Sequence, residues 1–453
     1  MKILILTFAV LFSAIAGVGQ TSDAALRRVI DTDMAARDAS GKLPTLSAAE
    51  HLSRAETYSA NRLFPQAREH WQKVFDNYPT DSGIPKALFG TARSFMWERK
   101  YADAVHWFDK LTEDHLSTKE GREGLSFKGA SYVRMGKNLE AAKTYEQYVA
   151  MFPDGERIES AHLNIIDAYR EAGRYDDAEK WVDRTTARFA GSPAEANALH
   201  ARLRMEIFRQ AWPEAISAAD ALLSSGSFRG SMTSVDEVKY LKALAMERAG
   251  RKNEAAAVYA SISDPSYFCG LWSDKQHSET VQPTASVSSR RAADFPVPFR
   301  DDLVREARKY KIDPRFLLAI MKQESSFRPS AKSPAGARGL LQLVFDTALK
   351  YNKKAGYANL QPDDLYQPSV NIAVGSAYVA ALKDEFGGLY EAIAASYNAG
   401  EDNAARWLHR SKPKDPGVFA SEVGFAETKN YVFKVMNNYR AYREIYTEGL
   451  ERK

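Results

Sequence analysis

Cysteine is almost absent from this chain: Cys269 is the only one among 453 residues. A single cysteine cannot form an intrachain disulfide, so the fold must be stabilised by packing alone. The eight histidines include no pair three or four positions apart and no HExxH pattern, so we expect no metal site and no cofactor. Acidic and basic residues nearly balance, at 58 and 62, without a long block of one sign. This balance argues against a nucleic-acid-binding protein.

A long membrane-spanning run is also missing, although the N-terminus carries a short apolar one. Lys2 precedes a mostly apolar stretch over residues 3–18, and small residues stand at its end. This pattern is typical of a signal peptide, which we place at residues 1–19. The alternative is a retained membrane anchor, but the run is short for a span and polar sequence follows it. No cysteine lies nearby, so a lipoprotein anchor is not expected.

The middle of the chain repeats itself with a period of about 37 residues between positions 48 and 260. Small residues recur at this spacing, and an aromatic or apolar residue usually follows four positions later. The pattern resembles tetratricopeptide repeats and predicts one helix pair per unit, because each alanine allows two helices to cross closely. Glu206 and Ala219 interrupt the pattern, so the fifth unit is expected to be the least regular. The repeated alanines are Ala67, Ala104, Ala141, Ala178, Ala215 and Ala255.

The repeats predict an N-terminal α-solenoid over residues 20–262, with a concave surface suited to peptides, proteins or long polymers. The helical period then disappears, and a polar, Ser/Thr-rich segment predicts a loop or flexible linker over residues 263–294. Apolar side chains near its start, such as Tyr267 and Trp272, are expected to dock on the last repeat or on the next domain. Residues 295–453 regain helical periodicity with almost no alternation of period two, so the predicted fold class is all-α. Helices are expected there at residues 345–354, 371–386, 389–398 and 428–446.

One short helix of this second domain should begin at Asp313 and end on a carboxylate, Glu324. Asp313 suits the N-cap, a proline follows it, and the Arg-Pro pair at 328–329 stops the helix. Glu324 lies on the apolar stripe of this helix, so desolvation and the negative end of the helix dipole should both raise its pKa. Such an acid suits general acid catalysis near neutral pH. The alternative is a buried structural acid paired with an arginine such as Arg328 or Arg338. The stripe consists of Leu317, Ile320 and Met321.

Four segments around this glutamate resemble the motifs of the soluble lytic transglycosylases. ESSF (324–327), SPAGARGLLQL (333–343) and SYNAG (396–400) resemble the three core motifs of that family. FASEVGFAETKNYV (419–432) resembles the fourth segment, which closes the cleft. The resemblance covers about residues 295–446, and the motifs stand in the family's order. It implies a lysozyme-like, mostly helical catalytic domain that acts on peptidoglycan glycan strands in the periplasm.

The resemblance implies one catalytic carboxylate in place of the two that most glycosidases use. Glu324 would first protonate the glycosidic oxygen and then deprotonate the C6 hydroxyl of the muramoyl sugar, which attacks C1 without water. Ser333 would support the substrate's N-acetyl group, which replaces an enzyme nucleophile. Tyr397 and Asn398 would position the acid and the sugar. The implied substrate-binding residues are Ser333, Gln342, Tyr397, Asn398, Glu422 and Tyr431.

These assignments have alternatives. Backbone capping of buried turns would also explain Gln342 and Asn398, and Tyr431 would fit a plain core position. The chain also departs from the family, because Leu341 replaces the usual methionine and Ser396 replaces an alanine. The departures concern the shape of the sugar subsites and leave the acid in place.

Three classes of function stay open at this point. The favoured one is a peptidoglycan lytic transglycosylase, which cleaves the β-1,4 bond between N-acetylmuramic acid and N-acetylglucosamine and forms a 1,6-anhydromuramoyl end. A lysozyme-like hydrolase of the same fold would instead release a reducing end, heavier by one water. A non-catalytic wall-binding scaffold would rely on the repeats, which also offer a surface for a cell-wall protein partner. The combination of Glu324 with Ser333, Tyr397 and Asn398 argues against the scaffold.

Overall fold

The structure is a computed structural model that describes residues 19–263, 265–279 and 293–453. Over these ranges the chain forms helices and isolated bridges, and no strand. The predicted all-α class is therefore confirmed. The signal peptide predicted at residues 1–19 and the centre of the predicted linker fall almost wholly outside these ranges. None of the helices in them is long and apolar enough to cross a membrane.

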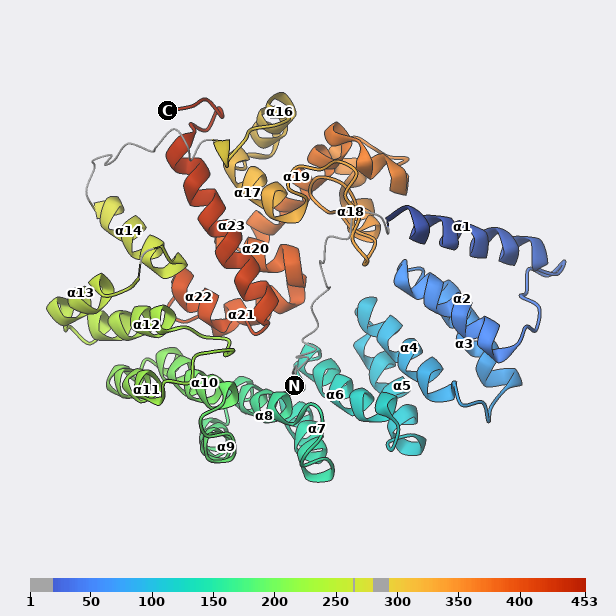
Figure 1. Cartoon of the computed structure of the whole chain (residues 1–453), viewed down its shortest axis with the longest axis horizontal. Helices are drawn as coiled ribbons and strands as arrows, with labels where there is room; N and C mark the ends of the chain where they lie inside the picture. The colour runs from blue at the N-terminus through green and yellow to red at the C-terminus, as the bar shows by residue number, and fades with distance from the viewer. Residues whose placement is uncertain (1–18, 264, 280–292) are drawn as a thin grey trace. The chain divides into compact units, whose positions relative to one another are not determined.

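The chain divides into two compact units. The N-terminal unit runs up to residue 201 and includes residues 334–336, and the C-terminal unit comprises residues 202–333 and 337–453. The N-terminal unit is built of helices that pack against their neighbours in sequence (Figure 1). The helices that begin in the N-terminal unit are α1 (Gly19–Ala36), α2 (Ala48–Ala60), α3 (Phe64–Asn77), α4 (Ile84–Trp97), α5 (Tyr101–Asp114), α6 (Lys119–Arg134), α7 (Asn138–Met151), α8 (Ile158–Glu171), α9 (Tyr175–Arg188) and α10 (Pro193–Arg209).

The repeated small residues lie in the buried interior of the helical repeats. All six of the repeated alanines are buried, as the sequence period predicted. The aromatic residue four positions later fills the space beside a glycine of an adjacent helix. A Cβ atom added to Gly90 would lie 2.4 Å from the ring of Trp71, and one added to Gly129 would lie 2.7 Å from the ring of Tyr145. Packing of α2 on α3, α4 on α5, α6 on α7 and α8 on α9 confirms the predicted helix pairs. The fifth unit also forms two helices, α10 and the helix that follows it.

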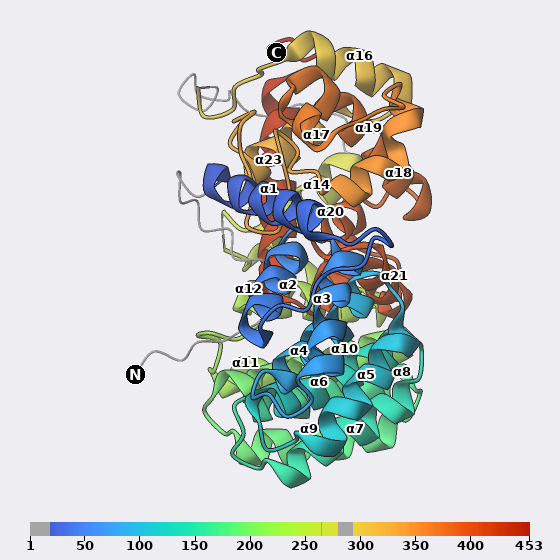
Figure 2. The same cartoon turned by 90° about the vertical axis from the view of Figure 1, so that its right-hand side faces the viewer.

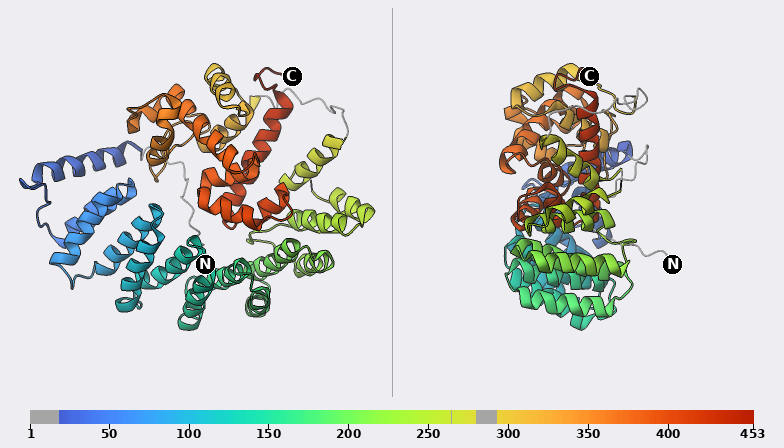
Figure 3. Two further views of the ribbon diagram at one scale, coloured as in Figure 1. Left: turned by 180° about the vertical axis from the view of Figure 1, so that it is seen from behind. Right: turned by 90° about the vertical axis from the view of Figure 1, so that its left-hand side faces the viewer.

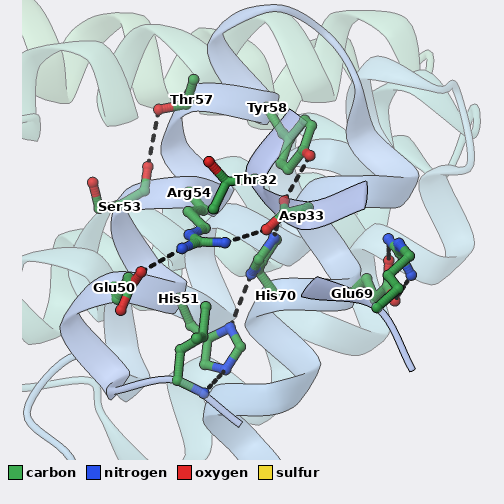
Figure 4. Close-up of polar contacts among 12 residues, drawn as sticks. Thr32, Asp33, Glu50, His51, Ser53, Arg54, Thr57, Tyr58, Glu69 and His70 are labelled. Carbon is green, nitrogen blue, oxygen red and sulfur yellow. Dashed lines mark hydrogen bonds and ion pairs between the residues drawn. The ribbon is translucent and has the colours of Figure 1, made fainter. Parts of the chain in front are cut away.

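A buried polar cluster fixes the first three helices of the N-terminal unit to one another (Figure 4). Asp33 of α1 is its centre. The Tyr58 hydroxyl donates to Asp33 Oδ2 over 2.7 Å, and His70 Nε2 lies 3.0 Å from the same oxygen. Arg54 forms an ion pair with the other oxygen of Asp33. These contacts hold the pKa of Asp33 below its usual value although burial opposes them.

The two histidines of this cluster, His51 and His70, form a defined chain of hydrogen bonds. The backbone N–H of Leu46 donates to His51 Nε2 over 3.1 Å, so neutral His51 carries its proton on Nδ1. That Nδ1 lies 2.9 Å from His70 Nδ1, which therefore accepts, and His70 in turn donates from Nε2 to Asp33. Both rings must be neutral for every one of these bonds to form. Burial is the main cause that lowers the pKa of His51 to about 4.

The C-terminal unit contains the remaining helices. Helix α19 is its core, because most of its side chains are buried on every face, and α16 and α18 both pack on it (Figure 2). Helices α17 and α20 both pack on α23, the long red helix in the view from behind in Figure 3. These helices are α11 (Trp212–Ser225), α12 (Val235–Arg248), α13 (Lys252–Ala260), α14 (Tyr267–Glu279), α16 (Arg300–Tyr310), α17 (Pro314–Glu324), α18 (Phe345–Ala355), the short 3-10 helix η1 (Pro362–Tyr366), α19 (Pro368–Glu385), α20 (Tyr390–Ala399), α21 (Glu401–Arg410), α22 (Pro416–Glu422) and α23 (Ala426–Ile445).

Helix α14 corrects one expectation. Its residues lie in the segment predicted as a loop or linker, and the apolar start of that segment forms a helix instead. The predicted docking is confirmed: the Tyr267 hydroxyl donates to Glu391 of α20 over 3.0 Å, and its ring stacks on Phe433 of α23. Trp272 stacks on Tyr259 of the last repeat, with ring centroids 4.1 Å apart. The helix forms because the last repeat on one side and α20 and α23 on the other bury its aromatic side chains. The polar composition of the segment as a whole hides these few aromatic residues.

Candidate active site

Helix α17 begins after Asp313 and ends at Glu324, as the sequence predicted. Asp313 caps its first turn, with a side-chain oxygen that accepts from the backbone N–H of Arg315 over 2.9 Å. The apolar stripe that leads to Glu324 is fully buried. Glu324 is the last residue of the helix, and its side chain is half-buried. The chain then turns sharply, because the backbone of both Ser326 and Phe327 is left-handed, with φ of 49° and 63°.

The surroundings of the Glu324 carboxyl group bring its pKa close to neutral pH. Burial raises its pKa to about 7, the hydrogen bond from Tyr431 acts in the opposite direction, and the negative charge of Glu427 raises it further. The Tyr431 hydroxyl donates to Glu324 Oε1 over 2.6 Å. This carboxyl can therefore be protonated or ionised near neutral pH at little cost, as a group that acts both as acid and as base requires. Arg328, one arginine considered as a structural partner, donates from Nε to the Ser325 carbonyl.

Tyr397 belongs to α20 and is a second predicted residue of the site. Burial raises the pKa of Tyr397 well above its usual value, and the charge of Glu324 raises it further. The Tyr397 hydroxyl donates to the carbonyl oxygen of Leu341 over 2.6 Å. Tyr397 therefore joins α20 to the loop that carries Ser333 and Gln342.

The loop over residues 331–343 is held by its own polar side chains. The Ser333 hydroxyl accepts from the backbone N–H of Ala337 over 3.1 Å. The side chain of Gln342, whose backbone is left-handed with φ 46°, donates to the carbonyl oxygens of Ala331 and Gly339 over 3.0 and 2.8 Å. Both side chains thus cap buried backbone, which was the alternative considered for Gln342. The structure brings them onto one loop that is joined to α17, because Ser325 donates to the Leu340 carbonyl over 2.7 Å.

Asn398 stands at the end of α20, on the side of α23. The Thr428 hydroxyl donates to its Oδ1 over 2.6 Å, which fixes the orientation of the amide. Thr428 is buried and belongs to the first turn of α23, the helix that also carries Tyr431. Of the predicted residues, Tyr431 contacts Glu324 directly, and the helix that carries it also binds Asn398 at the end of α20.

Comparison with known protein families gives a match over the part of the chain that contains Glu324. Residues 303–419 match the family described as "Transglycosylase SLT domain". This chain carries a transglycosylase SLT domain. Residues 128–193 match the family described as "Tetratricopeptide repeat", which agrees with the helix pairs of the N-terminal unit.

Curated relatives match over the region of the SLT domain. A "Soluble lytic murein transglycosylase" from Salmonella typhimurium is 34% identical over 144 residues, which are 31% of this chain and 22% of that protein. The protein of the same name from Escherichia coli strain K12 is 34% identical over 146 residues, with the same coverage. A "Membrane-bound lytic murein transglycosylase C" from Edwardsiella ictaluri is 32% identical over 166 residues, or 46% of its length. The match therefore spans about a fifth of the length of the soluble relatives and less than half of the membrane-bound one.

Two solved structures share the fold over nearly the whole chain. An inactive mutant of the lytic transglycosylase Slt from Pseudomonas aeruginosa is 17% identical, with a TM-score of 0.50, and the match covers 94% of this chain and 86% of that one. The 70-kDa soluble lytic transglycosylase in complex with bulgecin A is 16% identical, with a TM-score of 0.52 and coverage of 96% and 93%. They support the predicted fold of helical repeats followed by a lysozyme-like domain.

Two of the predicted site residues, Glu422 and Tyr431, follow the end of the matched SLT region. Glu422 ends α22 and is only 1% exposed. Its Oε2 lies 3.0 Å from both Arg204 Nη1 and Arg410 Nε, so its carboxylate is occupied by two guanidinium groups. Contact of Glu422 with substrate stays a prediction. Its ion pairs join α22 to α10 and α21, so Glu422 also has a structural role.

Sequence reasoning missed two residues that shape the site of the SLT domain. Glu427, one turn before Tyr431, acts on the pKa of Glu324, and its own pKa is raised by burial. Its Oε2 is buried and has no hydrogen-bond partner among the described residues. Asn371, fully buried in α19, accepts from the backbone N–H of Leu341 over 2.8 Å and so holds the loop over residues 331–343. A lone asparagine inside the apolar run of α19 was the available signal for the second.

The site can move a proton through Glu324, whose pKa is raised to about 7. Among the residues described, no group of three or more His, Cys, Asp or Glu side chains could hold a metal ion. The chemistry open to these residues is therefore that of one acid whose ionised and protonated forms are both accessible, flanked by hydroxyl and amide groups.

Proposed function

We propose that this chain is a peptidoglycan lytic transglycosylase. In this proposal the SLT domain cleaves the β-1,4 bond between N-acetylmuramic acid and N-acetylglucosamine and leaves a 1,6-anhydromuramoyl end. The observation that carries the proposal is the placement of Glu324 at the end of a buried apolar stripe, where it accepts a 2.6 Å hydrogen bond from Tyr431. This environment raises the pKa of Glu324 to about 7, which suits a group that serves first as acid and then as base. The printed names of the relatives, all murein transglycosylases, point to the same substrate.

In the first step, protonated Glu324 gives its proton to the glycosidic oxygen while the bond from that oxygen to C1 of the muramoyl sugar breaks. The substrate's N-acetyl group stabilises the positive charge at C1, and Ser333 supports it. The hydroxyl of Tyr431 donates to the carboxylate that is left, which lowers the free energy of the anion between the two steps. The carboxylate is then ready to accept a proton in the second step.

In the second step, the Glu324 carboxylate takes the proton of the C6 hydroxyl, and O6 forms a bond to C1 of the same sugar. Glu324 returns to its protonated form, and no water is consumed. The attack is intramolecular, so its effective molarity is high and favours the anhydro product over hydrolysis. Tyr397, Asn398 and Gln342 would orient the acid and the sugar, and the unpaired oxygen of Glu427 offers a further acceptor for a substrate hydroxyl or amine.

The rest of the chain is assigned around this activity. We propose a repeat domain at residues 20–262 and a catalytic domain at residues 295–453, joined through residues 263–294. The signal peptide proposed at residues 1–19 would deliver the protein to the periplasm, where glycan strands are found. The repeats would guide these strands or bind a cell-wall protein partner.

The test is the substitution Glu324→Gln in the full chain, assayed on purified peptidoglycan with mass analysis of the soluble products. Glutamine keeps the size of the side chain but cannot give a proton, so we expect turnover to fall by about 100-fold or more. Asp384→Asn, an exposed acid at the end of α19, is the matched control and should keep wild-type turnover and products.

The product mass distinguishes the functions. Products lighter by one water than reducing-end muropeptides, lost in Glu324→Gln but not in the control, support the proposal. Reducing-end products instead would establish the lysozyme-like hydrolase. Binding to peptidoglycan without any cleavage by the wild-type chain would establish the scaffold.

A further inference from the structure

The first turn of α23 has two faces with different tasks. Tyr431 reaches Glu324, and Thr428 on the same side reaches Asn398. Lys429 is two positions from Tyr431, which is about 200° around the helix, so its side chain leaves from the opposite face. On that face Lys429 is 3% exposed, although it carries an ammonium group. A buried ammonium needs a partner, and its partner lies outside the SLT domain.

The partner of Lys429 is Glu237 of α12, a helix of the last repeat. Lys429 Nζ lies 2.8 Å from Glu237 Oε1 and donates to the carbonyl oxygen of Met232 over 3.1 Å. Glu237 is 1% exposed. Burial lowers the pKa of Lys429, and the charge of Glu237 opposes this effect. The pair is thus fully removed from solvent, where an ion pair tolerates little displacement because neither charge can be satisfied by water.

A second buried pair holds the preceding helix, α22. Glu422 at its end contacts Arg204 of α10, and Arg410 of α21 binds both the carboxylate and, over 2.9 Å, the backbone carbonyl oxygen of the same residue. Arg204 also belongs to a repeat helix. The three residues between Glu422 and Ala426 therefore run between two anchors, and both anchors are set by side chains of the repeats.

The start of α22 is held by the repeats as well. Asp415 caps this helix by accepting from the backbone N–H of Gly417 over 2.8 Å, and the hydroxyl of Tyr240 of α12 donates to the same carboxylate over 3.0 Å. A Cβ atom added to Gly417 would lie 2.2 Å from the Tyr240 ring, so the two helices approach too closely for any larger residue. The path from Asp415 to Tyr431 is therefore fixed at its start, middle and end.

We propose that Glu237 and Arg204 of the repeat helices are positioning residues for the reaction of the SLT domain. By binding Lys429 and Glu422 they set the rotation of α23, and so keep the Tyr431 hydroxyl on Glu324. Apolar packing alone would allow a helix to turn or slide by small amounts, whereas a buried ion pair specifies one arrangement. The inference rests on the proposed transglycosylase function, and it gives the last repeats a task within the catalytic step.

The test is Glu237→Gln in the full chain, with turnover measured across pH and product mass as before. Glu324 must be protonated for the first step, so turnover falls as pH rises through its pKa. A weaker bond from Tyr431 to the Glu324 carboxylate moves that fall to higher pH, by up to about one pH unit, and lowers kcat by about tenfold. Glu237→Asp keeps the charge and should lie closer to the wild type in both respects.

The matched control removes an exposed ion pair on the same helix. Asp274 of α14 lies 3.1 Å from Arg440 of α23, with nearly half of the Asp274 side chain exposed. Asp274→Asn should leave the pH profile where it is. A role of the repeats in stability alone would lower the melting temperature of Glu237→Gln without moving its pH profile, and that result overturns the inference.

A second variant covers the case in which Glu237→Gln fails to fold, because it leaves the Lys429 charge unpaired. The double substitution Glu237→Gln with Lys429→Met removes both charges and should fold. We expect its turnover to fall at a higher pH than that of the wild type, since the directional contact is gone. A folded double variant with the wild-type profile would overturn the inference. If the wild-type chain forms no anhydro product, that result would instead count against the proposed function.

Discussion

Removal of a single hydroxyl, in Tyr431→Phe, should move the pH at which the proposed activity is lost. Tyr431 is the hydrogen-bond donor to Glu324 Oε1, at 2.6 Å. A donor to a carboxylate stabilises the ionised form, so it lowers the pKa, and its removal must raise it. Burial and the charge of Glu427 then act without opposition from this bond.

The size of the shift follows from the strength of such a bond. Hydrogen bonds to charged groups contribute about 1.5–3 kcal/mol, and one pKa unit corresponds to about 1.4 kcal/mol. Glu324 is half-buried, so solvent compensates part of the loss and the lower end of that range applies. The pKa of Glu324 should therefore move from about 7 to roughly one unit higher.

The assay is turnover on purified peptidoglycan between about pH 5 and pH 9, a range that brackets the shift expected from the lost bond. Because the acid must be protonated, wild-type turnover should fall as pH rises through about 7, and turnover of Tyr431→Phe should fall about one unit later. Tyr439→Phe is the control, since the Tyr439 hydroxyl also joins α23 to α17, at Asp313 over 2.8 Å. It should lower stability and leave the profile in place. An unmoved profile in Tyr431→Phe, or a shift to lower pH, would refute this account of Glu324.

Three further predictions concern other contacts. Glu427→Gln removes a negative charge near Glu324, so the fall in turnover should move to lower pH, in the same assay. His51 should titrate near pH 4 rather than 6.5 by histidine NMR, and the chain should lose about 3 kcal/mol of stability as pH falls between these values, because the unfolded state binds the proton first. His51→Leu should flatten this dependence in urea unfolding. Gly129→Ala places a methyl group 2.7 Å from the Tyr145 ring and should lower the free energy of unfolding by about 1–3 kcal/mol.

Sequence reasoning served the repeats well because their constraint is local and periodic. An alanine at a helix crossing recurs wherever a crossing recurs, so six positions carry the same information, and all six are buried. The segment after Ser261 has no such repetition. Its aromatic residues were expected to dock, but the helix that they form, α14, depends on partners in α12, α20 and α23, and local composition gave no account of those partners.

The sequence also predicted Glu324 as the acid, but it did not predict the opposing effects that set the pKa of Glu324. The apolar stripe and the helix end at Glu324 predict desolvation, which is the largest cause of its shift. The two smaller causes, Tyr431 and Glu427, lie more than 100 positions away in the chain and act in opposite directions. Arg204 and Glu422, which are 218 positions apart, likewise meet only in the folded chain.

The residues matched to the SLT family end at 419, yet the helix that completes the site begins after that point. In the proposed reaction, burial favours protonated Glu324 for the first step and Tyr431 favours the anion that the second step needs. A pKa near 7 serves both steps only while the two effects stay balanced. The helix that carries Tyr431 is in turn held by Lys429 on Glu237 of a repeat. A catalytic fragment cut between the repeats and the SLT domain would keep the acid but lose this anchor. Its turnover should therefore fall even on short glycan fragments that need no guidance by the repeats, whereas a purely guiding role of the repeats predicts full activity on them.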